Sequence, residues 1–283
     1  MSVRLCQASQ TSYAFPASTS EGACIIGREA ESLRLHQAIR RRDSLLICGP
    51  AGVGKTTLIS RVLAELPESL ARSVISVEGL DGLQPFLRAL LQKLHAAGDL
   101  TLSKQLRAEG VGSGGFKRWL KNQPTSRLKG AVYRSLQSAA YWVFLDHVPP
   151  ITLAVAKVVR ELAWMRNTPV FLVARGCGPE EIGHAANIYW SERHRMILEP
   201  LHTPAARELL ELCIQRFGLA RLDLDNFRKA VLSMSGHKPG ALVTMCKLAA
   251  EPRYHYDSRI KTRMIYIDYL MSLNGRNREA GQA

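Results

Sequence analysis

The sequence lacks any hydrophobic run long enough to cross a membrane. No stretch of its 283 residues approaches the roughly 18 uncharged apolar residues that a transmembrane helix needs. We therefore expect no membrane partner. Hydrophobic residues still form 46% of the chain, which suffices for one large core or two modest ones.

Closely spaced cysteine pairs are also missing. The six cysteines are scattered, and none forms a C-x-x-C pair or a Cys/His pair with metal-ligand spacing. Reduced thiols fit this distribution best. It fits a cytoplasmic protein, which is the location we expect.

Acidic residues are few compared with basic ones. The chain has 24 Asp and Glu against 38 Lys and Arg, which gives a formal net charge of +14. Such an excess favours a polyanionic partner, nucleic acid first and an anionic membrane surface second. A basic surface without a specific partner would have the same composition, so charge alone does not decide.

A phosphate-binding motif follows the first apolar run. Residues 45–48 are apolar, and residues 49–56 then read Gly-x-x-x-x-Gly-Lys-Thr directly before a helix-forming run. This is the strand, loop and helix context of a P-loop, in which glycines let successive backbone N–H groups face one anion. The predicted nucleotide-binding residues are Gly49, Pro50, Ala51, Gly52, Val53, Gly54, Lys55, Thr56 and Thr57.

Three side chains of this loop have separate predicted roles. Lys55 supplies a mobile positive charge for the β- and γ-phosphates, which also makes it a catalytic candidate. Thr56 places a hydroxyl where Mg²⁺ would bind. Thr57, the next helical residue, can reach an adjacent phosphate.

Two later apolar runs end in polar residues that could complete the site. The run 141–146 ends in Asp146, and ligands of doubly wound sheets bind at the carboxyl ends of strands. Asp146 is therefore a predicted Mg²⁺ ligand. The run 168–175 ends in Arg175, which would point toward the γ-phosphate; an arginine that simply meets solvent at a strand end fits equally well.

His147 directly follows Asp146, at the position where ATPases with a P-loop usually have a glutamate that polarises the attacking water. A neutral histidine can accept a proton near neutral pH, so His147 is a candidate catalytic base. The alternative is weak hydrolysis, with the protein acting as a binding switch.

Strands and helices alternate up to about residue 200, and only helices follow. Strands are predicted at 45–48, 73–78, 141–146, 168–175 and 196–198. Later helices are predicted from Thr203, at 226–234 and at 241–250, with a further helical pattern over 260–271. We expect a flexible tail at 1–22, an α/β core at 23–200, a helical lid at 201–275 and a C-terminal tail at 276–283.

The crossover between the second and third predicted strands is strongly basic. Clustered cations neutralise phosphates, and Phe116 and Trp119 among them could stack on bases. A solvated helical face with two core aromatics would look the same in sequence. The predicted DNA-contacting residues are Lys104, Arg107, Lys117, Arg118, Lys121, Arg127 and Lys129.

Several stretches taken together resemble the AAA+ ATPases. Within that class they are most similar to the STAND, origin-recognition-like and TniB-like transposition-helper members. They are IIGREAE, GPAGVGKTT, YWVFLD, PVFLVAR, EPL and GHKPGAL. The resemblance implies a P-loop NTPase three-layer α/β sandwich with a five-stranded parallel sheet and a C-terminal all-helical lid. It also implies that the nucleotide is ATP.

The resemblance carries further roles over to single residues. Ile26, Gly27 and Arg28 match the box that lines the adenine pocket, and Arg175 matches a sensor position. Pro239 matches the lid turn near the nucleotide, where many members have a sensor arginine. Arg193 or Arg195 lies where ring-forming members place an arginine finger, which would require a homo-oligomer, but no motif fixes which of the two, if either, has this role.

Two functional hypotheses follow from these observations. The first is an ATPase that couples the binding and hydrolysis of Mg-ATP to lid closure and to partner binding on DNA. The second is a STAND-like, nucleotide-gated switch that hydrolyses little and binds a partner protein instead of DNA. The net charge favours the first hypothesis, whereas His147 and Pro239 favour the second.

Overall fold

The computed structural model describes residues 26–112, 114–165, 167–189 and 191–280, with side chains described up to Leu273. The tail expected at 1–22 lies outside the described residues. The chain forms two compact units that interleave in sequence. The first contains residues 36–47 and 62–196, and the second contains residues 26–35, 48–61 and 197–280.

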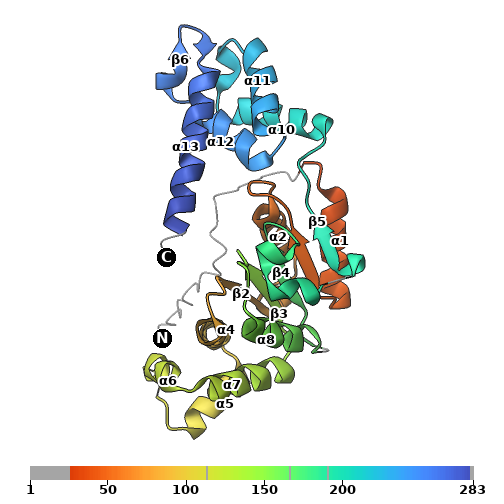
Figure 1. Ribbon diagram of the computed structural model, residues 1–283, viewed down its shortest axis with the longest axis vertical. Helices are drawn as coiled ribbons and strands as arrows, with labels where there is room; N and C mark the ends of the chain where they lie inside the picture. The colour runs from red at the N-terminus through yellow and green to blue at the C-terminus, as the bar shows by residue number, and fades with distance from the viewer. Residues whose placement is uncertain (1–25, 113, 166, 190, 281–283) are drawn as a thin grey trace, which may run out of the picture. The chain divides into compact units, whose positions relative to one another are not determined.

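A five-stranded parallel sheet organises the first unit (Figure 1). Its strand order is β2-β3-β4-β1-β5. Strands β1, β3 and β4 are buried along their whole length, as expected for a parallel sheet that is covered on both faces. The predicted strands are confirmed, with small shifts at their ends. They are β1 (Leu45–Cys48), β2 (Val74–Glu78), β3 (Trp142–Asp146), β4 (Val170–Ala174) and β5 (Arg195–Ile197).

The register of the central strands places their carboxyl ends at one edge. Leu145 of β3 lies opposite Leu172 of β4, and Glu78 of β2 lies opposite Asp146 of β3. The rings of Phe144 and Phe171 stack with centroids 4.4 Å apart and fix the pairing of β3 with β4. The polar residues that follow β3 and β4 therefore emerge side by side.

Helices cover this sheet, and most of them lie in the crossover between β2 and β3. Helix α4 buries an apolar face that includes Phe86, Leu90 and Leu94, and α7 buries Leu128, Val132 and Leu136. Figure 1 shows α5, α6 and α7 gathered together beyond α4. The helices of this unit are α3 (Glu68–Ala71), α4 (Leu83–Ala96), α5 (Leu100–Ala108), α6 (Phe116–Asn122), α7 (Thr125–Ser138), α8 (Leu153–Ala163) and α9 (Pro179–Ile182).

A helical subdomain with its own core makes up most of the second unit. Leu210, Phe227, Val231, Leu242 and Tyr254 are all buried in that core. Helices α1 (Glu29–Arg41) and α2 (Lys55–Ala64) contribute residues to both units. The remaining elements are α10 (Thr203–Arg216), α11 (Asp225–Ser235), α12 (Pro239–Ala249), the hairpin of β6 (His255–Tyr256) and β7 (Arg259–Ile260), and α13 (Thr262–Ala280).

The last helix differs from its prediction in two ways. It begins after Ile260, which belongs to β7, and it continues to Ala280, beyond the expected lid boundary at 275. Its core contacts come from Ile265 and from Asp268, which accepts a hydrogen bond from Tyr254 at 2.5 Å. The apolar residues at the predicted spacing are not covered, because Met264, Ile267 and Met271 are exposed. In the part of the chain that the structure describes, no helix is both long and apolar enough to cross a membrane.

Candidate nucleotide site

The loop between β1 and α2 is held in a glycine-dependent conformation. Gly52 and Gly54 have positive φ angles of 78° and 95°, in the region that side chains disfavour. Gly49 has no room for a side chain, because a Cβ there would overlap the carbonyl oxygen of Leu198. The backbone N–H of Leu198 donates to the carbonyl of Cys48 at 2.7 Å, so the chain after β5 runs directly beside the loop.

Lys55 folds back over this loop. Its Nζ donates to the carbonyl oxygens of Gly49 at 2.6 Å and Pro50 at 3.1 Å. The ammonium group therefore lies on the inner side of the loop, where a phosphate bound by the loop amides would meet it. Thr56 and Thr57 follow in the first turn of α2, half-buried and exposed, respectively.

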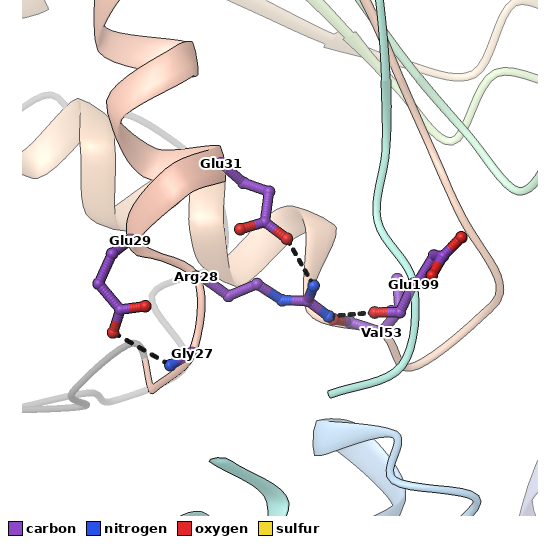
Figure 2. A network of polar contacts seen from close by, with 6 residues as sticks. All are labelled: Gly27, Arg28, Glu29, Glu31, Val53 and Glu199. Carbon is purple, nitrogen blue, oxygen red and sulfur yellow. Dashed lines mark hydrogen bonds and ion pairs between the residues drawn. The ribbon is translucent and has the colours of Figure 1, made fainter. Parts of the chain in front are cut away.

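Arg28 connects three separate segments around the loop (Figure 2). Its side chain is buried and forms an ion pair with Glu31 at 2.7 Å. The same guanidinium donates to the carbonyl oxygens of Val53, at 3.2 Å, and of Glu199. Arg28 thus fixes the back of the P-loop to the chain that leads into the helical subdomain.

This geometry gives Arg28 a positioning role that the sequence did not reveal. The role expected from the family resemblance, lining an adenine pocket, stays a prediction. Ile26 was matched to the same pocket, and its role there also stays a prediction. Its side chain is buried in the core of the helical subdomain, in one cluster with Leu201 and Ala205. Only the glutamate three residues after Arg28 could have indicated a local ion pair, and no local pattern points to Glu199.

The first turn of α12 rests on the P-loop. The backbone N–H of Gly240 donates to the carbonyl oxygen of Gly52 at 2.8 Å. A Cβ at Gly240 would lie 3.0 Å from Gly52, and a Cβ at Gly54 would lie 4.0 Å from the ring of Pro239. The structure therefore brings Pro239 to the loop, and it adds Gly240, which sequence analysis missed although it follows Pro239 in the GHKPGAL stretch.

We expect Gly240→Val to separate α12 from the loop, because its side chain would need space that the Gly52 backbone occupies. Nucleotide affinity should fall by about tenfold, which corresponds to about 1.4 kcal/mol. Titration with a fluorescent ATP analogue measures this change. Gly114→Val is the matched control because a Cβ at Gly114 meets nothing within 4 Å. Equal affinities of Gly240→Val and wild type would contradict the proposed packing of α12 on the loop.

The other predicted catalytic residues lie in the first unit, at the carboxyl ends of β3 and β4. Asp146 is buried, and its Oδ1 accepts the backbone N–H of His147 at 2.7 Å. His147 adopts a positive φ of 54°, and its side chain is 69% exposed. Its Nδ1 lies 3.5 Å from the same Asp146 oxygen, so the imidazole faces its own neighbour. Arg175 is exposed, one residue beyond β4.

The two arginine-finger candidates differ in their surroundings. Arg193 is exposed, whereas Arg195 is half-buried and its Nε donates to the backbone carbonyl of Tyr189. Of the two, Arg193 has the side chain that extends further into solvent. A role in a neighbouring subunit stays a prediction for both.

The sheet, the glycine-rich loop after β1 and the C-terminal helices together define a P-loop NTPase. The sequence matches the family described as AAA ATPase domain over residues 25–173, more than half of the chain. The chain therefore belongs to the AAA ATPase domain family. No curated protein matches it.

Solved structures with the same fold are distant in sequence. The Walker-type ATPase of Pyrococcus abyssi aligns with a TM-score of 0.60 and 14% identity, over 91% of this chain and 76% of that one. The Orc1 protein of Aeropyrum pernix in complex with DNA aligns with a TM-score of 0.57 and 15% identity, over 88% of this chain and 66% of that one. Cdc6p of Pyrobaculum aerophilum aligns with a TM-score of 0.55 and 9% identity, over 83% of this chain and 64% of that one. At these identities the likeness shows the fold alone.

Proposed function

We propose that this AAA ATPase binds Mg-ATP in the P-loop and that the bound nucleotide sets the position of the helical lid, which a partner then recognises. The contact between α12 and the loop carries this proposal, since Gly240 hydrogen-bonds Gly52 at 2.8 Å. A change in the backbone of the loop would therefore alter its contact with α12. Binding that favours one lid position shifts the population toward it.

The residues present suit ATP and Mg²⁺. The loop amides and Lys55 would hold the phosphates, and the hydroxyl of Thr56 and the carboxylate of Asp146 are hard oxygen ligands of the kind Mg²⁺ prefers. When bound, the metal neutralises charge that develops on the transferred phosphoryl group. His147 would accept a proton from the attacking water, and Arg175 would contact the γ-phosphate.

We further propose that DNA is the partner and that it binds through its phosphates to α5 and α6. The supporting observation is a group of exposed cations that have no carboxylate partner among the described residues. Lys117, Arg118 and Lys121 lie on the side of α6 that faces away from its buried residues. The complete group is Lys104, Arg107, Lys117, Arg118 and Lys121.

The other two predicted DNA-contacting residues are partly neutralised. Lys129 pairs with Glu161 at 2.8 Å, and Arg127 lies 3.5 Å from Glu109. Hydrogen bonds from the Trp119 indole N–H and, to a smaller extent, from the Gln105 amide hold the pKa of Glu109 below its usual range. This carboxylate is therefore ionised at neutral pH. Phosphate binding should therefore centre on α6 rather than on α7.

The proposed stacking role of Phe116 and Trp119 is wrong. Both side chains are only 7% exposed. Phe116 stacks on His95 of α4 with ring centroids 4.0 Å apart, and Trp119 donates to Glu109 at 2.7 Å. These aromatics hold α6 against α4 and α5, which presents the cations of α6 outward but leaves no ring for a base.

Replacing Lys117, Arg118 and Lys121 together by alanine should weaken binding to random-sequence duplex by at least about tenfold. The slope of log K against log salt should become shallower by about one for each phosphate that the variant no longer neutralises. Fluorescence anisotropy of a labelled duplex over a salt series measures both values. The control removes the same charge elsewhere, from the exposed residues Arg207, Lys229 and Lys247. Equally weakened binding in the two triple variants would show that only net charge matters.

A second candidate function is the nucleotide-gated, protein-binding switch. It is favoured by the exposure of His147, whose ring faces Asp146 at 3.5 Å, and by Pro239 in place of an arginine beside the loop. ATP turnover measured with and without duplex DNA separates the two candidates. DNA-stimulated turnover supports the DNA-dependent ATPase, whereas tight nucleotide binding with neither turnover nor duplex binding at low salt supports the switch.

A further inference from the structure

Trp164, at the end of α8, is unusually accessible for a tryptophan. Its side chain is 75% exposed, whereas Trp119 and Trp142 are 7% and 5% exposed. A large aromatic surface in water gains free energy when a flat or apolar group covers it. Nothing in the proposed ATPase cycle uses this residue.

The surroundings of Trp164 are cationic. The guanidinium carbon of Arg160, one turn earlier on α8, lies 5.6 Å from the centre of its ring. Two hydrogen bonds bring the end of α1 to the same place: Ser44 Oγ donates to the carbonyl of Ala163 at 3.3 Å, and Arg42 donates to the carbonyl of Asn167 at 3.3 Å. The run Arg40–Arg42 therefore ends beside the loop that carries Trp164.

The arginines of this run are not equivalent. Arg42 is fixed, because its guanidinium carbon lies 4.9 Å from the centre of the Trp142 ring. Arg40 and Arg41 are exposed in the last turn of α1 and have no carboxylate partner among the described residues. Both therefore carry exposed positive charge at the helix end that precedes the contacts of Arg42 and Ser44 with the Trp164 loop.

The acids nearby do not cancel this charge. Glu161, on α8, is occupied by Lys129 at 2.8 Å and by the hydroxyl of Tyr133, both on α7. Asp43, at the end of the basic run, is a single half-buried carboxylate. Arg160 lies against the exposed indole, and the run Arg40–Arg42 ends where Arg42 hydrogen-bonds the same loop, so an acidic ligand is the complementary one.

We propose that Trp164, with Arg160 and the exposed Arg40 and Arg41, forms a stacking platform for an unpaired base of single-stranded nucleic acid. The indole face stacks on the base, and the arginines contact the phosphates on either side of it. A base inside a duplex has both faces covered by its neighbours, so only an unpaired nucleotide can use the platform. This inference rests on the proposed binding of DNA and adds a preference for single strands, at a surface separate from the cations of α6.

The test compares labelled oligo-dT with a labelled, fully paired two-stranded duplex by fluorescence anisotropy. For Trp164→Ala we expect an affinity for oligo-dT about tenfold lower than that of wild type, and an unchanged affinity for the duplex. Trp164→Phe should keep most of the affinity because it keeps an aromatic face. Arg160→Gln should weaken oligo-dT binding as well, since it removes a charge next to the ring. Unchanged thermal unfolding would show that the variants fold, as expected for a side chain that is 75% exposed.

The possible results distinguish this inference from the proposed function. If the duplex binds in a salt-dependent manner but Trp164→Ala binds oligo-dT as tightly as wild type, the stacking platform is overturned and DNA binding stands. If neither nucleic acid binds at low salt, both proposals fail. A partner protein whose affinity depends on Trp164, together with oligo-dT binding that does not, would assign the surface to that protein and overturn the platform.

Discussion

Lys55→Ala is expected to abolish ATP turnover, with a loss of at least about a hundredfold. Its ammonium group is the only lysine nitrogen among the described residues that hydrogen-bonds to the P-loop, at 2.6 Å from the carbonyl of Gly49. In the proposed site, the substitution would remove the positive charge that Lys55 offers to the phosphates. Steady-state phosphate release measures turnover, and calorimetry measures nucleotide affinity.

The control for Lys55→Ala is Lys229→Ala, which removes the same charge from an exposed position on α11. This variant should bind and hydrolyse ATP as wild type does. Turnover in Lys55→Ala equal to that of wild type would remove the assignment of the loop as the nucleotide site. Abolished turnover with retained DNA binding would show that the two activities use separate residues.

Asp146→Asn is expected to reduce the rate of Mg²⁺-dependent turnover at least about a hundredfold. Nucleotide affinity measured without Mg²⁺ should stay nearly the same. Asparagine keeps a side-chain oxygen that can accept the hydrogen bond that the His147 backbone N–H donates to Asp146 Oδ1 at 2.7 Å in the wild type. The turn after β3 should therefore be preserved. The substitution therefore tests the charge of the carboxylate rather than the fold. Nucleotide affinity measured with and without Mg²⁺ should show a metal-dependent increase in wild type that the variant lacks.

Glu78→Gln is the matched control for Asp146→Asn. Glu78 ends the neighbouring strand in register with Asp146, but its side chain is exposed. Loss of one negative charge at this edge of the sheet should therefore leave turnover unchanged. If both variants lose activity equally, the general electrostatics of the strand ends, and not a metal ligand, explain the effect.

Local sequence patterns predicted most of the fold because its elements obey local rules. The buried runs that became β1, β3 and β4 are continuous apolar segments, as strands covered on both faces must be. The P-loop could be predicted because its backbone has positive φ angles at Gly52 and Gly54, which glycine adopts more easily than other residues. Thr203 followed by proline marked the start of α10 for the same kind of local reason.

The features that sequence reasoning missed depend on residues far apart in the chain. Arg28 is a positioning residue only because Glu199, 171 positions later, offers a carbonyl oxygen. The burial of Phe116 depends on His95 in another helix, and α13 turns its regular apolar stripe outward because Ile265 fills the core instead. Periodicity identifies an apolar face, but it does not say which neighbour, if any, will cover it.

The interleaving of the two units has a practical consequence for dissecting the protein. The unit that contains the helical subdomain also contains residues 26–35 and 48–61, so it is assembled from three separate stretches of polypeptide. A recombinant fragment that starts near residue 200 would lack Ile26, whose side chain lies in the core around Leu201. Cutting the chain at that position should yield an insoluble piece, and functions are better assigned by point substitutions in the intact polypeptide.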